Sequence, residues 1–151
     1  MADKNSFIQS VNTGYTFKGE SFVVGAAILN GEVLSEALVR LPLKTLNRHG
    51  LIAGATGTGK TKTLQVIAEG LSNASVPVMV MDIKGDFSGI AEQGSLNDKI
   101  KERYGKMALE YVPGSFPVEL MSLSEEKGVR LRATVSEFGP VLISKILFVN
   151  I

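Results

Sequence analysis

The sequence predicts an α/β fold, in which an incomplete parallel-sheet core carries a glycine-rich loop and follows a short β-rich N-terminal segment. Three observations predict it: a glycine-rich loop with the spacing G-x-x-x-x-G-K-T at residues 54–61, an amphipathic helical pattern directly after it, and short apolar runs on both sides. We expect residues 1–47 to form the β-rich segment and residues 48–151 the core.

The composition is that of a globular chain. Of 151 residues, 44% are hydrophobic and 21% charged, which argues against disorder. The net charge of +1 gives no general electrostatic attraction to nucleic acid or to an anionic membrane. The chain has no cysteine and a single histidine, His49, which argues against thiolate or histidine metal sites. No apolar run approaches the roughly 20 residues that span a bilayer, so we expect a soluble, cytoplasmic protein.

The segment from Phe22 to Leu38 predicts a β-hairpin. Apolar runs flank Asn30 and Gly31, a dipeptide that tolerates positive φ and suits a two-residue turn. Pro42 is expected at a strand end or on an edge, because it lacks the N–H group that a central strand needs.

A strand, a helix and a second strand are expected around the glycine-rich loop. The first strand is short, at Leu51–Ala53. Four apolar residues then recur with the spacing of one helical face: Leu64, Ile67, Ala68 and Leu71. Residues 73–77 should end this helix, and Val78–Asp82 should form a second strand with both faces covered, as in a parallel sheet. Such a unit has a right-handed crossover.

Further elements are expected towards the C-terminus. Ser95 could cap a helix that ends near Gly105, with Asp98 completing an approximate capping box. Two strands should follow, at residues 108–112 and, with alternating apolar and polar side chains, at residues 129–135.

The last expected helix has Ser136 as its cap and Pro140 in its first turn. The chain stops within this helix, on the apolar letters ILFVNI. This ending favours a fragment of a longer protein over a small domain whose end packs inward.

The glycine-rich loop carries the predicted chemistry. Its glycines allow backbone N–H groups to converge on a β-phosphate, and the following helix adds its positive end. Lys60 is expected to neutralise charge on the β- and γ-phosphates as the catalytic residue, and the Thr61 hydroxyl to be a Mg²⁺ ligand. The expected binding set for ATP and Mg²⁺ is Gly54, Ala55, Thr56, Gly57, Thr58, Gly59, Lys60, Thr61 and Lys62. A chance match is the alternative, and the flanking strand and helix argue against it.

Asp82 is a second candidate metal ligand. An aspartate at the carboxyl end of the strand after the loop helix lies near the place where a Walker B carboxylate holds Mg²⁺. Alternatively, Asp82 caps its loop, and residues 84–86 form an exposed turn. Its position in an α/β crevice fits both interpretations.

Other polar residues receive structural interpretations first. His49 could contact a nucleotide or a neighbouring subunit, but a lone histidine is more often structural. Arg130 and Arg132 fit a solvated strand face before an arginine finger or a DNA contact. Glu137 is explained by its favourable place at a helix N-terminus. Three aromatic residues are interpreted as core of the N-terminal segment: Tyr15, Phe17 and Phe22.

These motifs resemble the HerA/FtsK superfamily, in particular the bacterial HerA-like ATPases of the YjgR type. The resemblance is carried by R-H-G before the first strand, by G-A-T-G-T-G-K-T, by D-x-K-G-D followed by S-G, and by the segments GYTFKGESFVVGAAILNGEVL and TVSEFGPVLISKIL. It implies a P-loop NTPase with a RecA-like core, usually a hexameric ring, that couples ATP hydrolysis to DNA translocation or a similar motor task. The chain corresponds to the N-terminal part of that family.

The resemblance also implies residue roles and shows departures. Lys60 becomes the phosphate lysine and Thr61 the magnesium ligand, whereas the Asp82 strand normally precedes the true Walker B strand, which argues against Asp82 as the principal magnesium carboxylate. The sequence has no apolar strand ending in Asp-Glu and no assignable arginine finger. Two functions therefore remain open: a HerA-like ATPase, or a nucleotide-binding module without its own hydrolysis. A small kinase or GTPase would need an arginine-rich lid or an N-K-x-D motif, and neither is present.

Overall fold

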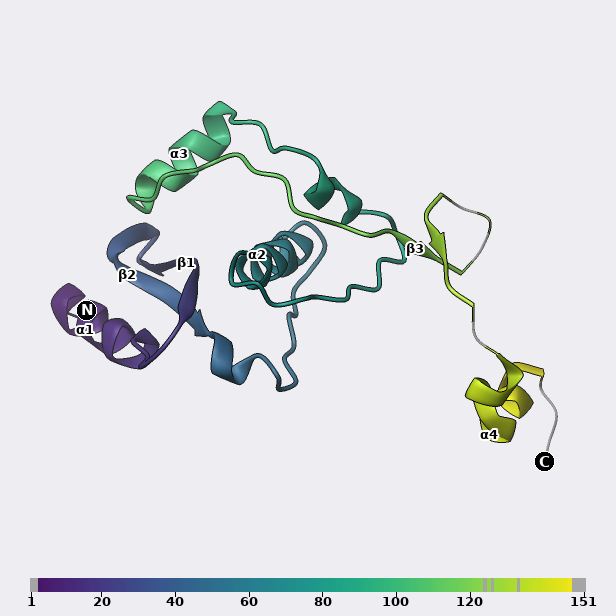
Figure 1. Ribbon diagram of the computed structural model, residues 1–151. Coiled ribbons are helices and arrows are strands. Elements are labelled where there is room, and N and C mark those ends of the chain that lie inside the picture. The colour runs from purple at the N-terminus through teal and green to yellow at the C-terminus, as the bar shows by residue number, and fades with distance from the viewer. Residues whose placement is uncertain (1–2, 124, 126, 133, 148–151) are drawn as a thin grey trace. The chain divides into compact units, whose positions relative to one another are not determined.

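The computed structural model describes residues 3–123, 125, 127–132 and 134–147 (Figure 1). The chain divides into two compact units, an N-terminal unit (Met1–Phe116) and a C-terminal unit (Pro117–Ile151). The described elements combine helices with a two-stranded antiparallel sheet and a short parallel strand pair. The predicted α/β character is therefore confirmed, but a complete parallel-sheet core is not present among the described residues.

The predicted hairpin is confirmed. Strands β1 (Ser21–Leu29) and β2 (Glu32–Pro42) pair antiparallel, and Pro42 is the last residue of β2. The turn residues Asn30 (φ 50°) and Gly31 (φ 83°) both lie in the left-handed region, as a two-residue type I′ turn requires. The turn sets the pairing next to it, and register shifts follow between Ala26 and Ala27 and between Val23 and Gly25.

Helix α1 (Lys4–Tyr15) precedes the hairpin and was not predicted. The Asp3 carboxylate caps it by accepting hydrogen bonds from the first-turn amides, and Lys4 pairs with Glu32 of β2 at 2.8 Å between Nζ and Oε1. The predicted β-rich character therefore does not hold at the start of the N-terminal segment. The expectation that Tyr15 and Phe17 are core residues is also wrong, because they are 40% and 37% exposed.

Helix α2 (Lys60–Asn73) follows the glycine-rich loop and ends where the sequence predicted. It contacts β1, and Gly70 lies close to the Phe22 ring of that strand. A Cβ atom on Gly70 would lie 2.6 Å from Cγ and 2.7 Å from Cε2 of the Phe22 ring. The buried residues of α2 are Ala68 and Gln65, whereas Leu64 of the predicted apolar stripe is exposed. The buried face is therefore rotated from the one that the apolar spacing indicated.

The predicted strands at 51–53, 78–82 and 108–112 are wrong for the described structure. A strand exists only when a neighbour completes its hydrogen-bond ladder, and the ladders among the described residues join β1 to β2 and β3 to β4. Leu51 and Met81 are 89% and 87% exposed. These apolar segments therefore run as irregular chain, and the predicted strand–helix–strand unit keeps only its helix.

Helix α3 (Asp98–Lys106) is confirmed with a different cap. The Asn97 side chain, not that of Ser95, accepts the first-turn hydrogen bond, from the Ile100 amide at 2.9 Å. The Tyr104 ring of α3 packs edge-on against Tyr111, with 5.1 Å between ring centroids. This contact joins α3 to the extended segment that follows it.

The C-terminal unit holds the short parallel strand pair. Strand β3 (Met121–Ser122) lies parallel to β4 (Val129–Arg130), and the Leu131 amide donates to the Ser122 carbonyl at 2.8 Å. Only the first two residues of the predicted strand at 129–135 are therefore strand, and Ala133 lies outside the described residues.

Helix α4 (Val135–Leu147) contains a break at Gly139 (φ 66°, ψ 164°), after which Pro140 starts the second part. Ser136 is not the cap; the amide and hydroxyl of Thr134 instead donate to Glu137 Oε2, at 2.6 and 2.9 Å. These two bonds hold the pKa of the Glu137 carboxyl below its ordinary value. The predicted continuation over 148–151 lies outside the described residues. Within the described part of the chain, no helix has the length and apolar character needed to cross a membrane.

Candidate phosphate-binding site

The backbone of residues 54–61 depends on its glycines. Gly57 (φ 81°) and Gly59 (φ 95°) lie in the left-handed region, which side chains with a Cβ atom rarely adopt. Gly54 is needed for space, because a Cβ atom there would lie 2.6 Å from the Thr58 hydroxyl oxygen. Each of these three glycines therefore has its own steric reason in this loop.

Hydrogen bonds inside the loop converge on the Ala55 carbonyl oxygen. The Thr58 hydroxyl donates to it at 2.8 Å, and the Lys60 ammonium group also donates to it at 2.8 Å. The ammonium group of Lys60 thus folds back over the loop. A phosphate oxygen is a stronger acceptor for an ammonium group than a neutral carbonyl oxygen, so a polyphosphate can compete for this lysine.

The N-terminus of α2 offers further donors. The helix begins at Lys60, its N-cap residue is Gly59, and no side chain caps the first turn. The first N–H groups of a helix have no partner within the helix, and they carry the positive end of the helix dipole. With Lys60, Thr61 and Lys62 in the same turn, the donor set fits a polyphosphate. The exposed Thr61 hydroxyl is a hard oxygen ligand of the kind that Mg²⁺ prefers.

The Asp82 carboxylate stabilises the turn that follows it in the chain. Its Oδ1 accepts a hydrogen bond from the Gly85 amide at 3.0 Å and its Oδ2 one from the Phe87 amide at 2.7 Å. Gly85 has a φ of 76°, and the Phe87 side chain is buried. This is the loop-capping arrangement that was one of the two interpretations of the sequence. Among the described residues, no group of three or more His, Cys, Asp or Glu side chains could hold a metal ion.

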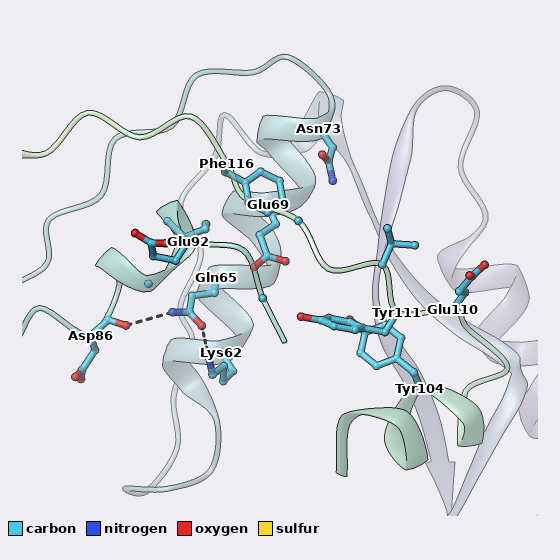
Figure 2. Close-up of a pocket in the computed structure, with 15 residues that line it drawn as sticks. Lys62, Gln65, Glu69, Asn73, Asp86, Glu92, Tyr104, Glu110, Tyr111 and Phe116 are labelled. Atoms are coloured by element: carbon cyan, nitrogen blue, oxygen red, sulfur yellow. Dashed lines mark hydrogen bonds between the residues drawn. The ribbon is translucent and has the colours of Figure 1, made fainter. Parts of the chain in front are cut away.

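A cavity of about 470 Å³ lies beside α2 (Figure 2). One side of it is a single face of the helix, formed by Lys62, Gln65, Glu69 and Asn73. The other side comes from α3 and from the chain segments at 86–94 and 110–116. Partial burial raises the pKa of Glu69 above its ordinary value, and the Lys62 charge opposes this rise. Burial likewise raises the pKa of Tyr104, with a smaller contribution from the Glu69 charge.

Gln65 is a residue that the sequence reasoning missed. Its Nε2 donates to the Asp86 carbonyl oxygen at 3.2 Å, and its Oε1 accepts from Lys62 Nζ at 2.8 Å, as Figure 2 shows. The side chain is only 8% exposed. The sequence signal for this role was the position of Gln65 beside the apolar stripe of the helix. An amide group buried there needs hydrogen-bond partners for both its oxygen and its nitrogen.

The remaining candidates are exposed. His49 lies in the irregular chain before the loop, Arg130 is in β4, and Arg132 follows that strand. The exposure of Arg130 and Arg132 agrees with their interpretation as solvated side chains, whereas the structural interpretation of His49 stays a prediction.

Comparison with known families gives one match. A family model described as Helicase HerA-like C-terminal matches residues 28–151, which include the glycine-rich loop, α2 and the Asp82 loop. Neither the curated proteins nor the solved structures contain a significant match. The matched region covers well over half of the chain.

Proposed function

The chain belongs to the helicase HerA-like C-terminal family, and from this premise we propose that it binds ATP with Mg²⁺ at residues 54–62. The bound ATP is hydrolysed to drive DNA translocation or a similar motor task. The observation that carries this proposal is the geometry of the loop. Two left-handed glycines and a glycine with no room for a Cβ atom shape the loop, and the helix start without a side-chain cap leaves its first N–H groups available to phosphate oxygens. The YjgR-like subgroup and the correspondence to the N-terminal part of that family stay predictions.

Each residue of the first turn has a role in this proposal. Lys60 leaves the Ala55 carbonyl and neutralises charge on the β- and γ-phosphates, while the loop amides orient them. Thr61 and Lys62 lie beside the same phosphates, Thr61 as an oxygen ligand and Lys62 as a second cation. Bound Mg²⁺ would supply further neutralisation of the phosphate oxygens. Asp82 as a metal ligand remains a secondary part of the proposal.

A second candidate function is nucleotide binding without hydrolysis. The observation that favours it is the engagement of Asp82, because both carboxylate oxygens accept hydrogen bonds from the amides of its own loop. The sequence also contains no Asp-Glu pair of the kind that holds Mg²⁺ and polarises water. In this alternative the chain acts as a switch or an assembly module.

The deciding experiment measures Mg²⁺-dependent ATP hydrolysis with and without double-stranded DNA. The full chain is compared with Lys60→Ala and with Lys44→Ala, a matched control that removes an exposed lysine outside the loop and α2. Turnover that is lost in Lys60→Ala and kept in Lys44→Ala supports the ATPase and refutes the binding-only alternative. Binding of ATP by calorimetry without turnover supports the alternative. Absence of binding at about 1 mM ATP overturns both the ATPase and the binding-only alternative, because a Kd of about 1 mM corresponds to only about 4 kcal/mol of binding free energy.

The DNA partner, the hexameric ring and a cytoplasmic location belong to the same proposal and rest on the family and the composition. The boundary between residues 47 and 48 stays a prediction as well. Sedimentation velocity with and without Mg²⁺·ATP tests the ring, since a shift from a 16.1 kDa species to a hexamer is easily resolved.

A further inference from the structure

The side chain of Gln65 connects the phosphate-binding loop to the Asp82 loop. It lies in the second turn of α2, and its amide group is held at both ends: Lys62 Nζ donates to Oε1, and Nε2 donates to the Asp86 carbonyl (Figure 2). Gln65 is only 8% exposed and lines the cavity beside α2, and a buried amide group needs its hydrogen-bond partners. The inference drawn from this arrangement rests on the proposed nucleotide binding.

The Asp86 carbonyl lies within a turn that is closed by other contacts. The Asp82 carboxylate accepts from the amides of Gly85 and Phe87, and the Phe87 ring is buried directly after Asp86. A single hydrogen bond from Gln65 therefore fastens this turn to the helix that carries the phosphate-binding residues. A continuous chain of contacts runs from Lys62 through Gln65 and the turn to Asp82.

A bound polyphosphate acts on the first link of this chain. Lys62 belongs to the first turn of α2. Its ammonium group donates to the neutral Oε1 of Gln65 and also interacts with the charge of the Glu69 carboxylate. A phosphate oxygen attracts an ammonium group more strongly than that amide oxygen does. Once Lys62 turns to the phosphate, the buried Oε1 of Gln65 has lost its donor, which favours a reorientation of the amide group.

We propose that Gln65 is a positioning residue that couples occupancy of the phosphate-binding loop to the closure of the turn at residues 82–87. Withdrawal of Lys62 loosens the hold of Gln65 on the Asp86 carbonyl, so that the turn opens more often. Opening releases the Gly85 and Phe87 amides from Asp82 and leaves its carboxylate available to another partner. Nucleotide binding thereby changes the availability of the Asp82 carboxylate, the one acidic group that the sequence predicted as a metal ligand.

The test follows amide hydrogen exchange of Gly85 and Phe87 by NMR in the ¹⁵N-labelled full chain, with and without Mg²⁺·ADP. Binding of the same ADP is measured separately by calorimetry. In the wild type, Mg²⁺·ADP should speed exchange at both amides by about fivefold, the effect of weakening one hydrogen bond. In Gln65→Met, exchange should be fast without nucleotide and unchanged by it.

Two further variants separate this coupling from a general loss of structure. Gln65→Glu keeps an acceptor for Lys62 but has no donor for the Asp86 carbonyl, so its amide exchange should match that of Gln65→Met. If Gln65→Met does not fold, Gln65→Glu alone tests the coupling. Asn73→Leu makes a comparable amide-to-apolar change on the same helix face and should keep the wild-type response. Binding of Mg²⁺·ADP without any change in exchange overturns the coupling alone, as does a wild-type response in both Gln65 variants. Absence of ADP binding overturns the proposed function and the coupling together.

Discussion

Replacing Gly70 by alanine should weaken the packing of α2 on β1. Gly70 lies in the interior of the helix, and the Phe22 ring of β1 occupies the place where a Cβ atom would go. The new methyl group would lie 2.6 Å from Cγ of that ring, well inside the 3.4 to 4 Å of ordinary van der Waals contact. Cγ is fixed to the Phe22 backbone through one carbon atom, so the ring cannot yield by a small rotation of its tip.

Two opposing terms set the size of the effect. Forcing an extra methyl group into a packed contact costs about 1 to 3 kcal/mol, whereas alanine in place of glycine within a helix gains about 1 kcal/mol. Because the overlap is with the body of the ring, we expect the upper part of the packing range and a net loss of about 1 to 2 kcal/mol. In a chain of this length such a loss lowers Tm by about 2 to 8 °C.

The assay is thermal and urea unfolding followed by circular dichroism. Gly105→Ala is the matched control, because Gly105 also lies within a helix, α3, but a Cβ atom there would meet nothing within 4 Å. It should be stabilised by about 0.5 to 1 kcal/mol. In a Phe22→Ala background, the cost of Gly70→Ala should disappear, since the double-mutant cycle isolates the contact. A Gly70→Ala chain as stable as Gly105→Ala would refute the close approach of helix and ring.

Three further predictions concern the loop, the cavity and the cap of α3. Gly54→Ala should weaken binding of Mg²⁺·ATP by about tenfold, measured by calorimetry, because its methyl group would displace the Thr58 hydroxyl; unchanged affinity would contradict the steric reason for this glycine. Burial raises the pKa of Glu69 above its ordinary value of 4.5. The folded state therefore favours the protonated carboxyl group, and this contribution to stability is complete below pH 4.5 and is lost as the pH rises through the raised pKa. Urea unfolding should therefore find Glu69→Gln more stable than the wild type at about pH 7 and equal to it at about pH 4, and equal stabilities at both pH values would argue against burial. Asn97→Ala should cost about 1 kcal/mol and Ser95→Ala almost nothing, whereas the reverse order in the same unfolding assay would restore Ser95 as the cap.

Local sequence signals predicted the elements whose stability is local. The Asn30-Gly31 turn fixes the hairpin because both residues tolerate positive φ. The end of α2 was likewise readable from the polar residues that follow it. Helix α1 was missed because its apolar residues are few, and its order depends on the Asp3 cap and on contact with β2.

The errors in the predicted strands fall where structure depends on distant partners. The runs at 51–53 and 78–82 have the composition of buried strands, but composition cannot say whether a neighbouring strand completes the ladder. At the site, the motif located the loop and gave Lys60 and Thr61 their expected roles. It could not show that Lys60 rests on the Ala55 carbonyl, or that Gln65 reaches the Asp86 backbone, since both are contacts of side chains with backbone oxygens.

The hydrogen bond between Lys60 and the Ala55 carbonyl must be broken before Lys60 can bind a ligand. A ligand that recruits this lysine does not gain an ammonium contact outright, because it must first replace one that already exists. An anion of low charge density gains little from this replacement, whereas a polyphosphate that also engages the uncapped amides of α2 gains several contacts at once. In the proposed function, the resting position of Lys60 would therefore favour di- and triphosphates over simple anions.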